Sequence, residues 1–156
     1  MKRFVLAIAL AWSASALALE GNAPNCVDFN GQVLPVNNQQ VVQYKQTTKN
    51  EFHARAHVNG TVTQLYSNQT GHQHFQMTME GTSQTLEVVY EMNFGKIPVQ
   101  VGASVEACGD YITSNAPYQG YPVSPDGALI HWVHRSDTSK HPQGFVIENN
   151  VVYGQQ

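Results

Sequence analysis

The side chains best suited to chemistry are concentrated in one stretch near the C-terminal end of the chain. Residues 127–141 read GALIHWVHRSDTSKH and hold three of the seven histidines, one aspartate and a tryptophan, namely His131, His134, His141, Asp137 and Trp132. Histidine is the side chain whose unperturbed pKa lies nearest neutrality, and its neutral ring is a common metal ligand. The stretch therefore predicts a functional site, but its composition alone selects neither a reaction nor a ligand.

A second group of polar side chains lies on a predicted β-hairpin. Residues 72–79 and 84–92 both alternate between apolar and polar side chains, which is typical of strands. Aligning their apolar faces sets one register, because a slip of one residue would put those faces on opposite sides. In this register His72 lies opposite Glu91, and His74 shares the same polar face.

A divalent metal ion is the first chemistry that these residues predict. His72 and His74 share a strand face, whereas His131 and His134 point to opposite faces unless the strand ends or bulges between them. Imidazole and carboxylate ligands together suit zinc or another first-row divalent ion. The predicted metal ligands are His72, His134, Asp137 and His141.

Acid–base catalysis is the second chemistry that these residues predict. A histidine oriented by Glu91, together with a second histidine, can act as base and acid in the hydrolysis of a phosphodiester or similar bond. The chain has no Gly-x-Ser-x-Gly motif, so a covalent serine nucleophile is not indicated. The predicted catalytic residues are His72, His134 and Asp137.

Ligand binding without catalysis is the third function that these residues predict. Aromatic side chains of the loop 113–127, with Trp132, can stack against a glycan, a peptide or another small polar ligand. The predicted binding residues are His74, Glu91, Tyr118, Tyr121, His131 and Trp132. A purely structural role competes with all three interpretations, because His131 and Trp132 stand among apolar residues and can belong to the core.

The first residues predict export. Lys2 and Arg3 precede an apolar run over 4–12 and a run of small residues that ends at Ala18. This order is that of a secretory signal peptide, here spanning 1–18. The apolar run is shorter than the roughly 20 residues of a spanning helix, and no later segment qualifies. We expect a periplasmic or extracellular protein with no membrane span.

The net charge of the mature chain argues against one class of binding partner. Loss of Lys2 and Arg3 leaves six basic residues against eleven acidic ones, a net charge of −5. A duplex nucleic-acid binder needs a basic surface to neutralise phosphates, so nucleic acid is not the expected partner. We expect a monomer that takes a small-molecule or glycan ligand.

The two cysteines predict a disulfide. Cys26 and Cys108 are the only cysteines of the chain, and in an oxidising compartment they most simply pair with each other. Closing so long a loop stabilises the fold by roughly 4 kcal/mol in the chain-entropy model.

The periodicity predicts an all-β domain. Residues 19–53 are polar and mostly irregular, with a short helix near 38–44, and residues 54–156 hold about five strands plus a C-terminal hairpin over 145–147 and 151–153. A small OB-like barrel is the expected fold, because curling removes exposed strand edges. A small β-sandwich is the alternative.

Several motifs resemble one family. They are His72-Gln-His-Phe75, Val101-Gly102, Gly109-Asp-Tyr111, Gly127-Ala-Leu-Ile-His-Trp-Val-His134, Asp137 and His141-Pro-Gln-Gly-Phe145. With them the chain is similar, over about residues 55–153, to small secreted bacterial proteins grouped as domain-of-unknown-function family 3465. It departs at Met92-Asn93, where the family pattern has His-Asn. The resemblance implies an exported small β-barrel and no established reaction.

Overall fold

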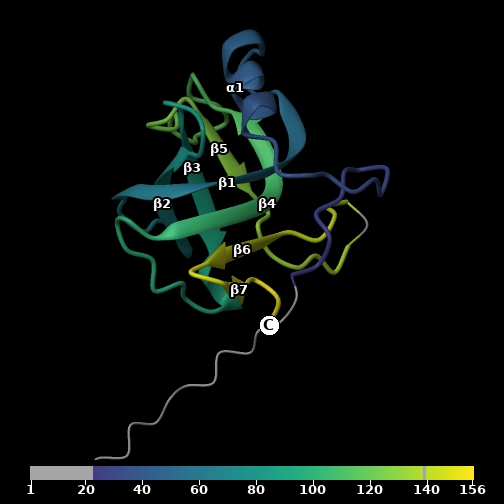
Figure 1. Cartoon of the computed structure of the whole chain (residues 1–156). Coiled ribbons are helices and arrows are strands. Elements are labelled where there is room, and N and C mark those ends of the chain that lie inside the picture. Colours follow the sequence, from purple (N-terminus) through teal and green to yellow (C-terminus); the bar gives the residue numbers. More distant parts are fainter. Residues whose placement is uncertain (1–22, 139) are drawn as a thin grey trace, which may run out of the picture.

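A closed β-barrel forms the body of the protein in the computed structural model, which describes residues 23–138 and 140–156 (Figure 1). Its strands are β1 (His53–Leu65), β2 (His72–Met79), β3 (Thr85–Glu91), β4 (Ser104–Thr113) and β5 (Ala128–His131). They follow the order β1-β2-β3-β5-β4, and β4 pairs back onto β1 to close the barrel. The small barrel predicted from the sequence is therefore confirmed, and the sandwich alternative is not what forms. The predicted signal peptide lies outside the described residues.

Alternation of side chains sets the register of the β2–β3 hairpin. The pairing runs from His72 opposite Glu91 to Thr78 opposite Thr85, as the sequence predicts. The inward side chains are fully buried; those of these two strands are Phe75, Met77, Met79, Leu86, Val88 and Tyr90. Burial of one face makes any other register costly, since a slip would expose the apolar side chains.

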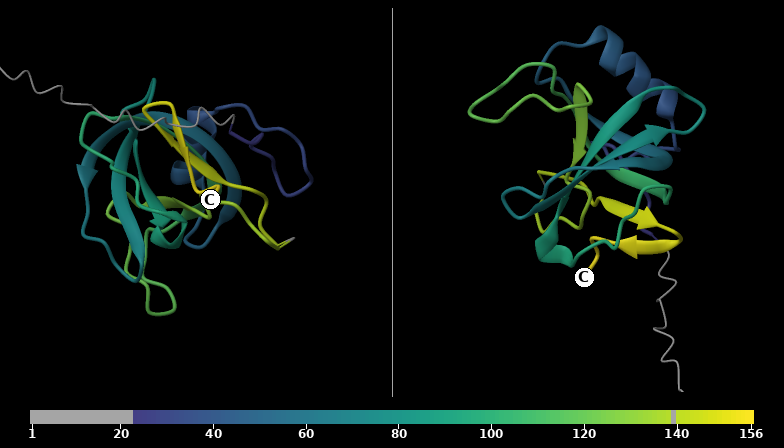
Figure 2. Two further views of the ribbon diagram at one scale, coloured as in Figure 1. Left: turned by 90° about the horizontal axis from the view of Figure 1, so that it is seen from below. Right: turned by 90° about the vertical axis from the view of Figure 1, so that its left-hand side faces the viewer.

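Two further strands extend the sheet beyond the barrel. Strands β6 (Phe145–Glu148) and β7 (Val151–Tyr153) form the expected C-terminal hairpin, and β6 pairs with the first half of β4 (Figure 2). Asn149 and Asn150 have φ of 47° and 67°. Positive φ at both positions is typical of a type I′ turn, and asparagine tolerates it better than most residues.

The segment that precedes β1 in the chain forms a helix that packs against the barrel. Helix α1 (Asn38–Thr47) begins where the Asn37 side chain accepts a hydrogen bond from the backbone N–H of Gln40. This cap satisfies one of the free N–H groups of the first turn. Val41 is buried in the barrel core, and the Tyr44 ring lies 5.4 Å from that of Tyr111. Within the described residues, no helix is long and apolar enough to cross a membrane.

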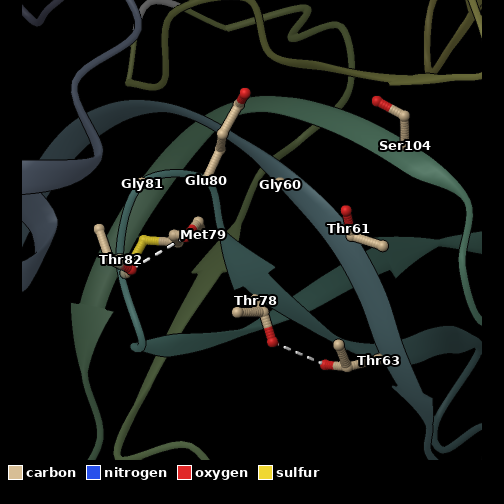
Figure 3. A pocket seen from close by; sticks show the side chains of 9 residues that line it. All are labelled: Gly60, Thr61, Thr63, Thr78, Met79, Glu80, Gly81, Thr82 and Ser104. Atoms are coloured by element: carbon tan, nitrogen blue, oxygen red, sulfur yellow. Dashed lines mark hydrogen bonds between the residues drawn. The ribbon is translucent and has the colours of Figure 1, made fainter.

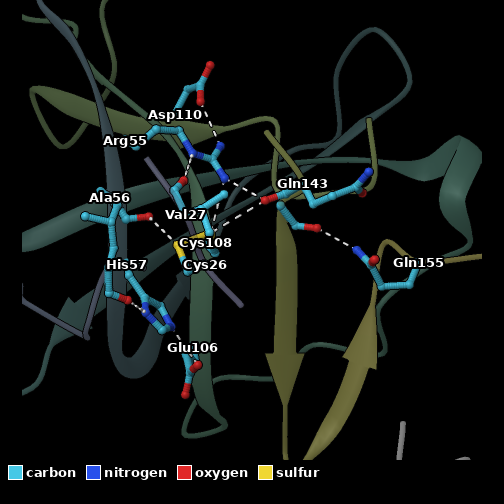
Figure 4. Close-up of a disulfide and its surroundings, with 12 residues drawn as sticks. Cys26, Val27, Arg55, Ala56, His57, Glu106, Cys108, Asp110, Gln143 and Gln155 are labelled. Carbon is cyan, nitrogen blue, oxygen red and sulfur yellow. Dashed lines mark hydrogen bonds and ion pairs between the residues drawn. A yellow bond between two sulfur atoms is a disulfide. The ribbon is translucent and has the colours of Figure 1, made fainter. Parts of the chain in front are cut away.

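A disulfide ties the N-terminal segment to the barrel. Cys26 and Cys108 are bonded across a sequence separation of 82, which confirms the predicted pairing (Figure 4). Beside the bond, the buried Arg55 donates hydrogen bonds to Asp110 and to the carbonyl of Gln143. The segment before α1, β1, β4 and the loop before β6 therefore meet at one point.

Removal of the disulfide should lower stability without changing the fold. We expect the double variant Cys26→Ala/Cys108→Ala to lose about 4 kcal/mol in the free energy of unfolding, because the unfolded chain regains the entropy of an open loop. Urea unfolding measures this, and wild-type protein in dithiothreitol is the matched control and should behave like the variant. A loss below about 1 kcal/mol, or alkylation of two thiols in unreduced native protein, would contradict it.

Candidate histidine site

Four histidines gather on the outer face of β2, β3 and β5, and we name them the imidazole cluster: His72, His74, His131 and His134. Alternation places the first two on that face of β2, opposite the buried Gln73 and Phe75. The third ends β5, which runs parallel to β3. The rings of His72 and His131 lie 5.2 Å apart between centroids, and their Nε2 atoms are separated by 3.4 Å.

A left-handed residue brings His134 to the same region as His131. Strand β5 ends at His131, and the next residue, Trp132, has φ of 53°. A positive φ is a genuine outlier for so bulky a residue. The strand alternation that would separate His131 from His134 therefore stops between them. The His134 ring stacks on Phe94 with centroids 4.3 Å apart, and its Nε2 lies 3.6 Å from a carboxylate oxygen of Glu91.

Close backbone packing holds this segment in place. Gly109 of β4 pairs regularly with β1, and a side chain there would overlap the carbonyl oxygen of His131. Gly144 donates its N–H to the carbonyl of His134, and a Cβ on it would meet the backbone of Trp132. Glycine at both positions allows the neighbouring strands to approach the turn after β5.

Three rings of the cluster have their Nδ1 atom engaged. The partners of His72, His74 and His134 are the carbonyl of Thr70 at 3.0 Å, the carboxylate of Glu87 at 2.7 Å and the carbonyl of Arg135 at 2.7 Å. Each partner accepts a hydrogen bond from the Nδ1–H group, and in a neutral ring this leaves the lone pair on Nε2. Metal-binding histidines are usually oriented by such contacts.

Two of these lone pairs have no partner. The Nε2 atoms of His74 and His134 are buried and make no hydrogen bond within the described part of the chain. The His134 side chain is only 6% exposed. An unsatisfied buried polar atom costs about 1–3 kcal/mol, so such an atom suggests a missing partner.

The environment keeps His131 neutral. The pKa of His131 is lowered to about 4, first by burial and then by the neighbouring imidazoles of His72 and His134, while Asp110 acts in the opposite direction. A neutral imidazole is the form that binds metal ions.

The remaining residues of the predicted metal set lie elsewhere. The Asp137 side chain is 80% exposed and pairs with Arg135 at 3.8 Å. His141 donates a hydrogen bond from Nδ1 to the Asp110 carboxylate at 2.7 Å and stacks on Trp132 with centroids 3.9 Å apart. Among residues 23–138 and 140–156, no three histidine, cysteine, aspartate or glutamate side chains are arranged to hold a metal ion. The structure thus does not assemble the predicted set of His72, His134, Asp137 and His141.

The predicted stacking residues separate into two groups. Tyr118 and Tyr121 lie in the loop between β4 and β5 and are 45% and 73% exposed. Trp132 is covered on one face by His141, so that face is not free for a ligand. The sequence reasoning missed Asp110 and Phe94, because the contacts that bring them to the histidines join distant segments.

Two shallow cavities flank the barrel. One, of about 460 Å³, lies beside the imidazole cluster and is lined by His74, Tyr66, Asn68 and Lys96 among others. The other, of about 430 Å³, is lined by the hydroxyls of Thr61, Thr63, Thr78 and Ser104 with Glu80, and contains no histidine (Figure 3). The first cavity gives a ligand a place next to the cluster.

Comparisons with known proteins add no family. No protein-family model matches this chain, and no curated protein matches it. The resemblance to family 3465 stays a prediction that rests on the motifs quoted above.

Acid should destabilise the metal-free protein through His131. The unfolded chain has an ordinary histidine pKa near 6.5 and the folded protein has a pKa of about 4 at His131. Between these values only the unfolded chain binds the proton, so the free energy of unfolding falls as the pH is lowered from about 6.5 to 4. We expect His131 to account for up to about 3 kcal/mol of this fall.

Urea unfolding of chelator-treated protein between pH 7 and pH 4 measures the effect. The variant His131→Gln lacks it and should lose correspondingly less stability, whereas His53→Gln, which changes an exposed histidine, should follow the wild type. Parallel curves for wild type and His131→Gln would contradict the prediction.

Proposed function

We propose that this protein binds one first-row divalent metal ion, with zinc the expected ion, at the imidazole cluster. The observation that carries the proposal is the 3.4 Å separation of the Nε2 atoms of His72 and His131. Two zinc–nitrogen bonds of about 2.0–2.1 Å at a tetrahedral angle place their nitrogens about 3.3 Å apart. The two rings are therefore spaced as a pair of ligands to one tetrahedral ion.

His134 is the proposed third ligand. Its Nε2 is buried and makes no hydrogen bond, with the Glu91 carboxylate 3.6 Å away, and its Nδ1 is already held by the carbonyl of Arg135. Because three ligands are not yet gathered, binding requires a side chain to turn toward the ion. Beside the site, the buried carboxylate of Glu87 contacts Nδ1 of His74 at 2.7 Å and orients that ring.

Metal-assisted hydrolysis is the proposed use of the ion. His72, His131 and His134 would hold the ion, and a zinc ion held there would supply Lewis-acid activation of water near neutral pH. The Glu91 carboxylate, 29% exposed and 3.6 Å from His134, is placed to accept a proton there. The cavity beside His74 supplies room for a substrate.

The barrel and the disulfide support the place and setting of the site. The strand order, with β3 and β5 parallel, agrees with an OB-like barrel, in which the β2–β3 face commonly binds ligands. The imidazole cluster lies on that face. The Cys26–Cys108 bond suits the oxidising conditions of the periplasm or the extracellular space.

A non-catalytic binding module is the second candidate. The polar lining of the cavity beside His74, with Tyr66, Asn68 and Lys96, supports a small polar ligand or a glycan. Panels of phosphodiester, peptide and glycan substrates separate the candidates: a hydrolase with bound metal turns over at least one class, and a binding module turns over none.

Metal titration tests the proposal. We expect untagged protein of residues 19–156, stripped with chelator, to bind one Zn²⁺ or Co²⁺ per chain in calorimetry and in Co²⁺ absorption spectra. His72→Ala and His131→Ala should each weaken binding about 100-fold or more, since each removes a ligand.

His53→Ala is the matched control, because this exposed histidine contacts Glu51 and not the cluster. It should bind the ion as the wild type does. Absence of binding by the wild type, or equal loss in His53→Ala, would reject the metal site.

A further inference from the structure

We infer that Trp132, His141 and Asp110 form an aromatic clamp that positions His131 and His134, so that His141 acts through Trp132 and is not a metal ligand. The inference rests on the proposed function for its main readout. It assigns a role to three residues that lie next to the imidazole cluster and outside its proposed ligand set.

The clamp holds a strained backbone. Trp132 has φ of 53°, a left-handed conformation that is sterically unfavourable for a residue with a Cβ atom. Such strain persists only where the surroundings enforce it, and it concentrates at functional sites. Glycine would adopt this φ freely, so the tryptophan side chain has a role of its own at this position.

Stacking on His141 is the side-chain contact that, beside the close backbone packing at Gly109 and Gly144, supports this conformation. The Trp132 and His141 rings are nearly parallel, with centroids 3.9 Å apart and planes inclined by 11°. The His141 ring is in turn fixed by the 2.7 Å contact of Nδ1 with Asp110. That carboxylate also accepts a hydrogen bond from the buried Arg55, so the clamp is anchored to β1 and β4.

The position of the clamp decides where two cluster histidines point. The Trp132 ring lies 5.4 Å from the His131 ring and 5.6 Å from the His134 ring. If the stack is lost, Trp132 can relax to negative φ and continue the strand. Alternation would then turn His134 to the face opposite His131.

Two substitutions of His141 separate positioning from metal ligation. His141→Phe keeps an aromatic face for Trp132 but cannot bind a metal, and His141→Ala keeps neither. We expect His141→Ala to weaken Co²⁺ binding about 10- to 100-fold and to alter the Co²⁺ absorption bands. His141→Phe should stay within about threefold of the wild type, and His53→Ala should be unchanged.

Equal loss in both variants would show that an aromatic face stacked on Trp132 is not what positions the cluster histidines, and would overturn the clamp. Unchanged binding in His141→Ala would also overturn it. If His141→Ala does not fold, His141→Leu takes its place, because leucine fills the space without an aromatic face.

A second readout does not depend on the metal. In ¹H–¹⁵N spectra of metal-free protein, the ring signals of His131 and His134 should shift in His141→Ala and stay near the wild type in His141→Phe, while those of His57, which contacts Leu34 and Glu106, stay constant. If the wild type binds no ion, the proposed function fails, and these spectra alone decide the clamp. Ring signals that do not move in His141→Ala reject it.

Discussion

The buried ion pair of Arg55 and Asp110 is the contact on which the rest of the site depends. Both side chains are almost fully buried, at 1% and 3% exposure, and a buried charge is tolerated only when it is paired and fully hydrogen-bonded. Arg55 meets this requirement by donating also to the carbonyls of Val27 and Gln143. Asp110 meets it through His141. One guanidinium thereby fixes the N-terminal segment, two barrel strands and the loop that returns to β6, and loss of either partner would strand an uncompensated charge in the interior.

This anchoring explains how polar rings can be packed on the outside of a sheet whose inside is already filled. The inner face of β2 and β3 buries apolar side chains and holds the barrel together. The outer face does not have to contribute to the apolar core, so it can carry histidines. These histidines are covered by Phe94 and by the segment after β5. Covering them removes water from the rings, and this desolvation is the largest cause of the low pKa of His131. The same covering leaves Nε2 atoms that only a new partner can satisfy.

The sequence predicted those features of the fold that depend on residues close together in the chain. The alternation of residues 72–79 and 84–92 was sufficient for the register of the hairpin and for the face on which His72 and His74 lie. It was not sufficient for His131 and His134, because their approach depends on a left-handed tryptophan that no propensity favours. The contact of Asp110 with the site could not be predicted for a different reason. Asp110 lies next to His131 because β4 pairs with β5, and a long loop separates these two strands in sequence. His141 was predicted to be a ligand from its residue type and spacing, and the structure instead engages it with Asp110.

We propose the imidazole cluster as a metal site, and not as a set of structural histidines, because two of its ring nitrogens are buried without a hydrogen bond. A structural histidine ends with both nitrogens satisfied, as His57 does between Leu34 and Glu106. In the cluster, the fold satisfies Nδ1 of three rings and leaves Nε2 of two of them buried without a hydrogen bond, that of His134 lying 3.6 Å from Glu91. Each such atom costs about 1–3 kcal/mol, and the left-handed Trp132 adds about 1–2 kcal/mol of strain. A small domain has a total stability of only about 5–15 kcal/mol, so these costs are a substantial fraction of it. In the proposed metal site, a bound cation would offset part of these costs once a side chain turns to complete the set of ligands.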